Sequence, residues 1–149
     1  MSKSFGLAAA LSLAFVTGSA LAASDVPPGW GVVSGPLVYP AGELPPTLTV
    51  CAQTIGDRDT HCTTRHIRAK GGVRYSLPLP PGNYHVYAMT PDCVNWRAYY
   101  TAAVPCGLSI QCKSHARIPI AVRPGSSRSD VSPADWYDVP ETKKNACDP

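Results

Sequence analysis

The chain has 149 residues, of which 44% are hydrophobic, and a formal net charge of +3 at pH 7. This length is enough for one domain with its own hydrophobic core and too short for two. The charge is close to neutral, whereas nucleic-acid binding requires a strongly basic surface. We therefore expect one folded domain and no nucleic-acid partner.

The first 22 residues have the organisation of a secretory signal peptide. A basic start at Lys3 leads into an apolar run over residues 5–16, and small residues precede an expected cleavage before Ala23. The run is shorter than the roughly 20 residues that span a bilayer, so we expect no transmembrane anchor. Cleavage leaves 127 residues and removes Lys3, which lowers the net charge from +3 to +2. The expected location is the periplasm or the extracellular space.

After a proline-containing tether at residues 23–30, two segments predict the first strands. Residues 31–39 form the first, which is interrupted near Gly35-Pro36 because proline cannot donate to a strand ladder. Residues 47–55 and 60–68 then predict a hairpin around Gly56-Asp57.

This hairpin predicts a disulfide. With Gly56 and Asp57 as the turn, counting outward places Cys51 opposite Cys62. Opposed residues on neighbouring strands have Cα atoms about 4.5 to 5.5 Å apart, a separation that a disulfide tolerates.

Residues 73–88 carry the clearest pattern in the chain. Apolar and polar residues alternate over 73–79 and again over 84–88, with Pro80-Pro81-Gly82-Asn83 between them. Proline presets φ and glycine permits a positive φ, which is what a type II turn requires. We therefore predict two strands folded back on each other.

Residues 98–104 and 115–123 predict two further strands, and the tail, residues 124–149, is rich in Ser, Asp and Pro and should be largely irregular. About seven short strands with turn signals between them predict an all-β sandwich over residues 31–123. The tail is expected to pack on this domain or to be tethered to it.

All six cysteines follow the signal peptide, and an even number in an exported chain predicts a disulfide framework. A zinc site is not favoured, because two Cys-x-x-Cys pairs are absent from the sequence. Cys106 and Cys112 close a small loop, and elimination then pairs Cys93 with Cys147. That last bond would tie the tail to the loop after residue 88.

Several segments together carry a resemblance: Tyr39-Pro40 with Leu44-Pro45, residues 79–88, residues 104–108, Cys112 with His115, and residues 133–137. Over roughly residues 31–137 the chain resembles a group of small exported bacterial proteins with a carboxypeptidase regulatory-like, prealbumin-like (transthyretin-like) sandwich. The resemblance implies a seven-stranded Greek-key sandwich without a catalytic site, in a fold used for accessory, adhesive or structural modules. Four cysteines and the tail after Tyr137 depart from the family pattern: Cys51, Cys62, Cys93 and Cys147.

The sequence argues against catalysis. A serine nucleophile is not expected, because the sequence has no Gly-x-Ser-x-Gly motif. The strand pattern also places no aspartate beside His115, as a catalytic triad would require. A cysteine nucleophile is not expected either, because no free thiolate remains when all six cysteines form disulfides. The candidate metal ligands are four histidines: His61, His66, His85 and His115. His61 and His66 are five residues apart, which places them on opposite faces of one strand and argues against a shared site. We expect no enzyme activity, no metal and no cofactor.

Binding is expected instead on loops, where aromatic side chains meet irregular backbone. The candidate binding residues are Trp96, Tyr99, Trp136 and Tyr137. The expected partner is an envelope or secreted protein, or a polysaccharide. Two alternatives stay open: a small secreted inhibitor or immunity protein that binds a toxin or hydrolase, and a carbohydrate-binding accessory domain in which aromatic side chains act as platforms.

Overall fold

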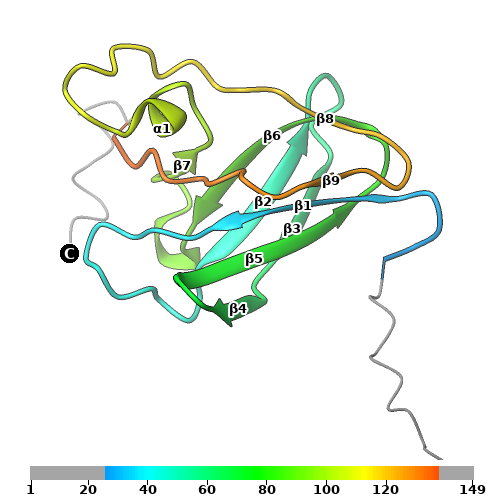
Figure 1. Ribbon diagram of the computed structural model, residues 1–149, viewed down its shortest axis with the longest axis horizontal. Helices are drawn as coiled ribbons and strands as arrows, with labels where there is room; N and C mark the ends of the chain where they lie inside the picture. The colour runs from blue at the N-terminus through cyan, green and yellow to red at the C-terminus, as the bar shows by residue number, and fades with distance from the viewer. Residues whose placement is uncertain (1–25, 138–149) are drawn as a thin grey trace, which may run out of the picture.

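Alternating apolar and polar residues form strands that pack as two β-sheets (Figure 1). The computed structural model describes residues 26–137, so the predicted signal peptide and residues 138–149 lie outside the described residues. The strands are β1 (Gly31–Pro36), β2 (Thr49–Thr54), β3 (Thr60–Thr63), β4 (His66–Ala69), β5 (Gly72–Leu79), β6 (Gly82–Met89), β7 (Ala98–Tyr99), β8 (Ile120–Val122) and β9 (Ser127–Arg128). Two short helical segments are η1 (Pro91–Cys93) and α1 (Ala103–Cys106).

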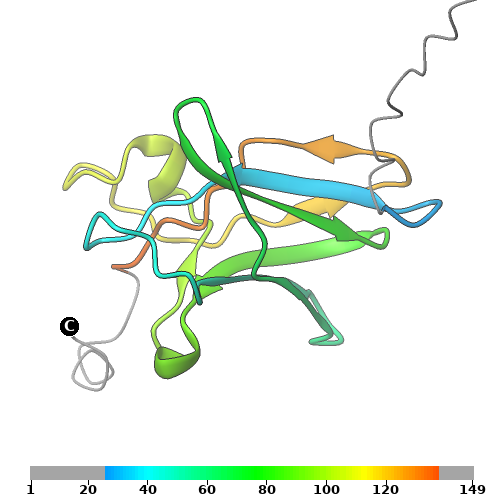
Figure 2. The same ribbon diagram turned by 90° about the horizontal axis from the view of Figure 1, so that it is seen from below.

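The first sheet has the order β4-β5-β1-β9, and the second has the order β3-β2-β6-β7, with β8 also paired to β6. All pairs are antiparallel except β1 with β9. Figure 2 shows the sheets as two layers, with blue β1 and orange β9 together in one of them. The predicted all-β sandwich is confirmed. The described residues hold more strands than expected, because the run 60–68 divides in two and the tail adds β9.

The core lies between the sheets and is built from the inward positions of the strands. Strand periodicity places every second side chain on the same face, and these are the apolar ones. The buried core residues include Val33, Leu48, Val50, Ala52, Tyr75, Leu77, Leu79, Tyr84, Val86, Ala88, Ile120, Val122, Val131 and Trp136.

The predicted pairing of the arms of residues 73–88 is wrong, although both strands form. β5 pairs with β1 and β4, whereas β6 pairs with β2, β7 and β8. Each arm buries its apolar face, so the two strands lie in different sheets and contribute to one core from opposite sides. The turn is also not type II, since Gly82 is not among the glycines with positive φ.

A tyrosine marks this crossing between the sheets. The Tyr84 hydroxyl donates to the carbonyl oxygen of Pro80 at 2.8 Å, the arrangement of a tyrosine corner in sandwich domains. A Cβ on Gly82 would come within 3.2 Å of the Tyr84 ring. The glycine therefore provides room for the ring rather than a left-handed backbone.

The hairpin of β2 and β3 confirms the predicted register. Cys51 is opposite Cys62, and their Cα atoms are 4.1 Å apart in a disulfide. The predicted continuation of β3 to residue 68 is wrong, because the chain leaves this sheet after Thr63 and enters the other as β4. There β4 and β5 form a hairpin in which Ala69 is opposite Gly72.

The predicted strand at 98–104 is also too long. β7 ends at Tyr99, and the chain turns into the single helical turn α1. Pro105 lies in that turn, where its missing N–H costs little, whereas in a strand it would remove a ladder hydrogen bond. The predicted strand at 115–123 is reduced to β8, with an isolated bridge between Thr101 and Arg117.

The tail is irregular apart from β9 as far as residue 137, yet residues 131–136 are buried. The Tyr75 hydroxyl donates to the carbonyl oxygen of Val131 at 2.7 Å, and burial raises the pKa of Tyr75 so that this proton stays in place. A Cβ on Gly35 would come within 2.0 Å of the same carbonyl oxygen. The segment after β9 thus lies directly on β1, and the core extends beyond the predicted boundary at residue 123.

Candidate functional site

Two of the predicted binding residues close one end of the core. The Trp96 and Trp136 rings have centroids 5.0 Å apart, and Tyr39 is 5.1 Å from Trp136. The Trp136 indole N–H donates to the carbonyl oxygen of Val38, and the Trp96 indole N–H donates to that of Trp136. These contacts tie the tail to the segment after β1, so both tryptophans have structural roles.

The other two predicted binding residues differ in exposure. Tyr99 is buried, with its ring 5.3 Å from that of Tyr87 and with the Arg117 guanidinium 3.7 Å from its centroid. Tyr137 has 67% of its surface exposed. A binding role for these four residues stays a prediction, but only Tyr137 presents most of its side chain to solvent.

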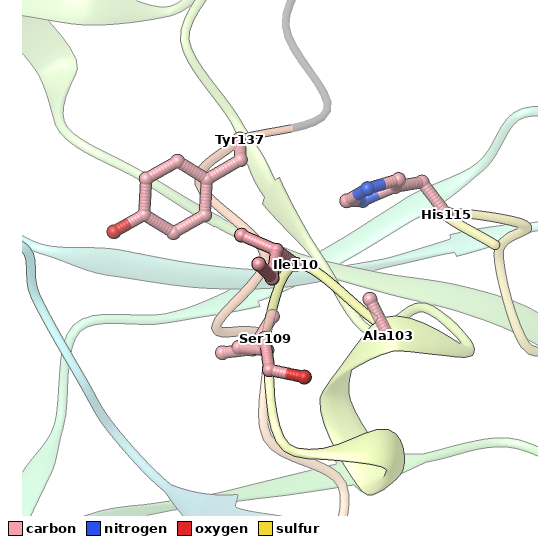
Figure 3. Close-up of a pocket in the computed structure, with 6 residues that line it drawn as sticks. Ala103, Ser109, Ile110, His115 and Tyr137 are labelled. Atoms are coloured by element: carbon pink, nitrogen blue, oxygen red, sulfur yellow. The ribbon is translucent and has the colours of Figure 1, made fainter. Parts of the chain in front are cut away.

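Tyr137 lines a pocket of about 320 Å³ beside α1 (Figure 3). The lining residues are Ala103, Leu108, Ser109, Ile110, His115 and Tyr137. In Figure 3, Ile110 lies between Tyr137 and His115. Ile110 has 88% of its surface exposed, so the pocket wall continues outward as an apolar rim.

The end of α1 and the predicted Cys106–Cys112 disulfide, which the structure confirms, shape this pocket. Gly107 ends α1 in the left-handed region at φ 106°, which glycine adopts without steric cost. Leu108 follows at φ 52°, and its N–H donates to the carbonyl oxygen of Ala103 at 2.9 Å. The tight turn and the disulfide together hold the pocket-lining loop against α1.

His115 is paired with an aspartate that the sequence pattern did not place beside it. The Nδ1 atom of His115 is 2.7 Å from Oδ2 of Asp135, and Asp135 is fully buried. The Thr101 hydroxyl donates to the same oxygen at 2.5 Å, and the Tyr137 N–H donates to Oδ1 at 3.3 Å. The expectation that no aspartate lies beside His115 is therefore wrong.

The pairing depends on contacts between distant parts of the chain. Asp135 forms an isolated bridge with Tyr99, which brings the tail beside Thr101. A second bridge, between Thr101 and Arg117, brings the segment that carries His115 to the same place. Strand periodicity carries no information on such a contact. The one available signal was that Cys112 with His115 and Asp135-Trp136-Tyr137 are specific parts of the same family resemblance.

When Asp135 is ionised it only accepts hydrogen bonds, and Nδ1 of His115 then keeps its proton and donates a hydrogen bond to the carboxylate. In the neutral imidazole the other ring nitrogen, Nε2, is then an acceptor. Among residues 26–137, Nε2 has no hydrogen-bond partner. With 39% of its side chain exposed, His115 thus brings one oriented acceptor to an apolar pocket.

A second pocket of about 470 Å³ lies near the start of β1, next to β3. Its lining combines Trp30 and Leu77 with polar residues of β3, including Thr60, His61 and Thr63. The Trp30 and His61 rings meet edge to face at 5.9 Å. This pocket offers one large aromatic side chain beside hydroxyl groups.

The four histidines are separated in the fold. His61 contacts Trp30, and Nε2 of His66 lies 2.8 Å from the carbonyl oxygen of Leu48. Burial, and to a smaller extent Arg117, lowers the pKa of His85. Within residues 26–137, no group of three or more His, Cys, Asp or Glu side chains is placed to hold a metal ion.

The disulfides Cys51–Cys62 and Cys106–Cys112 indicate an oxidising compartment. The third predicted pair involves Cys147, which lies outside the described residues; Cys93 is not a free thiol. In the part of the chain that the structure describes, no helix is long and apolar enough to cross a membrane.

No protein-family model matches the chain, and neither a curated protein nor a solved structure is significantly similar to it.

Proposed function

We propose that the chain is a non-enzymatic, exported binding module of the carboxypeptidase regulatory-like type, which binds an envelope or secreted protein through the pocket beside α1. The observation that carries the proposal is the apolar rim: Ile110 and Tyr137 both line the pocket and are 88% and 67% exposed. Large exposed apolar side chains around a pocket are typical of protein-binding sites.

The scaffold under this surface is suited to binding. The pocket loop is braced by the Cys106–Cys112 disulfide, and Tyr137 follows a buried segment anchored by Trp136. Side chains that are held in place before association lose less entropy when the complex forms. Little conformational entropy is therefore lost when Ile110 and Tyr137 bind a partner. The alternative function, an inhibitor or immunity protein, would need the same property.

The hydroxyl groups near His115 already have other hydrogen-bond partners, which favours a binding role over catalysis. The Ser109 Oγ lies 3.3 Å from the Cys112 sulfur, and the Thr101 hydroxyl is committed to Asp135. A serine protease-like mechanism needs a nucleophilic hydroxyl on the free nitrogen of the histidine. Here that nitrogen has no such partner among the described residues.

The test is affinity capture from an envelope extract with immobilised mature protein, with identification of the bound protein by mass spectrometry. We expect one protein to bind the wild type and to be lost with Ile110→Ser. Ile67→Ser is the matched control, because Ile67 is an exposed isoleucine on β4 outside the pocket. Equal capture by both variants, after both are shown to be folded, would contradict the proposed site.

The second pocket favours the carbohydrate-binding alternative, because an aromatic ring beside hydroxyl groups suits the mixed surface of a sugar. If this alternative holds, soluble envelope polysaccharide should bind the wild type and should not bind Trp30→Ala. Tyr137→Ser should leave that binding unchanged, because Tyr137 lies in the other pocket.

A further inference from the structure

The pocket beside α1 contains one polar ring nitrogen that the fold itself does not use. We infer that this pocket binds a tyrosine side chain of the partner protein, with the aromatic ring on the apolar wall and the phenolic hydroxyl donating to Nε2 of His115. The inference rests on the proposed function, since it names the side chain that the same surface takes.

The orientation of His115 is the first argument. Asp135 is fully buried and accepts hydrogen bonds from Thr101, His115 and the Tyr137 backbone. A carboxylate held in this way fixes both the ring plane of the histidine and its tautomer. In the neutral imidazole the nitrogen that remains is an acceptor, so it selects a ligand group that donates a hydrogen bond.

The shape and chemistry of the pocket are the second argument. Its wall is formed largely by Ala103, Leu108 and Ile110, and its volume of about 320 Å³ admits one aromatic side chain. A ligand must then combine an apolar body with a single donor at its tip. Tyrosine does so, whereas phenylalanine lacks the donor and serine lacks the apolar body. Lysine and arginine would have to lose the hydration of a full charge.

The surroundings of the pocket are the third argument. The exposed Ile110 and Tyr137 extend the apolar surface beyond the pocket. A free small molecule would leave this rim uncovered, whereas a side chain projecting from a protein surface covers pocket and rim together. Tyrosine is also enriched among the residues that dominate protein interfaces.

The test uses two probes that differ by one hydroxyl group: N-acetyl-L-tyrosinamide and N-acetyl-L-phenylalaninamide. Each is titrated at pH 8 into the ¹⁵N-labelled mature protein, and amide shifts are followed by NMR. We expect shifts around residues 107–112 and roughly three- to tenfold tighter binding of the tyrosine probe, as one added hydrogen bond provides. The imidazole Nε2 resonance of His115 should move with the tyrosine probe only. Equal affinities, an unmoved Nε2 resonance or shifts confined to other surfaces would overturn the inference.

Two variants separate the contributions of the acceptor and the wall. His115→Phe should abolish the preference for tyrosine while keeping binding of the phenylalanine probe within about twofold, because an aromatic ring remains in the wall and the acceptor is lost. The variant also loses the hydrogen bond to Asp135, so its fold is checked first. Ile110→Ser should weaken both probes together. If His115→Phe does not fold, the pair of probes and the Nε2 signal in the wild type still decide the matter.

The outcome is distinguishable from that of the proposed function. Loss of the captured partner with Ile110→Ser, combined with equal affinities for the two probes, would refute the tyrosine inference and leave the binding site standing. Capture that does not depend on Ile110, combined with a clear preference for the tyrosine probe, would refute the protein-binding proposal and leave a phenol-binding pocket.

Discussion

The two disulfides that lie within residues 26–137 hold regions of different kinds. Cys51–Cys62 joins strands that are already paired over four positions, so the hydrogen-bond ladder and the disulfide specify the same geometry. Cys106–Cys112 closes a loop that has no ladder, and the loop lines a pocket. The first region is fixed by local pairing, whereas the second depends on one covalent bond and on contacts with the distant tail.

The candidate site is therefore assembled from segments that are far apart in the sequence. Contacts of Gly35, Tyr75 and Trp136 hold the tail in place. The tail supplies Tyr137 to the pocket beside α1 and Asp135 to His115, which also lines that pocket. Changes that move the tail should therefore disturb the site without touching the pocket. Changes in the β2–β3 hairpin should leave it intact.

The largest effect is expected from Gly35→Ala, which tests how closely the tail lies on β1. The new Cβ would stand 2.0 Å from the carbonyl oxygen of Val131, a backbone atom that moves only with the whole segment. We expect a loss of about 3 kcal/mol in the free energy of unfolding, measured by urea denaturation. Gly42→Ala is the matched control: it meets no atom within 4 Å, and its positive φ should cost only about 1 kcal/mol. Equal losses would mean that the tail is not held against β1.

A smaller effect is expected from Asp135→Asn, which tests the link between tail and pocket. The new NH2 group of the asparagine is a donor, and it would face other donors: the Thr101 hydroxyl and His115 in one orientation, or the Tyr137 N–H in the other. Either orientation loses at least one hydrogen bond. We expect the free energy of unfolding to fall by about 2 kcal/mol. Asp130→Asn, an exposed position five residues earlier, should stay within about 0.5 kcal/mol of the wild type. A neutral Asp135→Asn would show that the carboxylate is not required for the assembly.

The smallest effect concerns His85 on β6. Burial and Arg117 lower its pKa below the ordinary value of 6.5, so the unfolded chain takes up a proton at a higher pH than the folded protein does. Stability is thus complete above about pH 6.5 and falls as the pH decreases until the folded histidine also protonates. Between about pH 7.5 and pH 5, the urea midpoint of the wild type should fall further than that of His85→Asn. Parallel pH profiles would refute this contribution.

Much of the fold is predictable because the signal is local. Alternation identified β1, β2, β5 and β6, and counting from Gly56 gave the pairing of Cys51 with Cys62. The sequence does not show which strands share a sheet. The apolar alternation of β5 and β6 would be the same if they paired in one sheet as it is in the structure, where they face each other across the core.

The candidate site was predictable only in part, for the same reason. The pairing of Cys106 with Cys112 is predicted and confirmed. Tyr137, one of the predicted binding residues, lines the pocket, and its binding role stays a prediction. The contact of His115 with Asp135 spans 20 residues and follows from the docking of the tail, which was expected to be irregular. Irregular backbone carries no periodic pattern, so its buried contacts are visible only in three dimensions.

A site built on the pocket beside α1 predicts that the captured partner binds two disulfide variants with different affinities. Isothermal titration calorimetry would compare Cys106→Ser/Cys112→Ser with Cys51→Ser/Cys62→Ser, each first shown to be folded at the working temperature. Because only the first of these two pairs lies in the pocket loop, we predict roughly tenfold or greater loss of affinity for that variant and a change within about twofold for the other. Loss of affinity in the hairpin variant, with binding retained by the loop variant, would contradict a site built on the pocket beside α1.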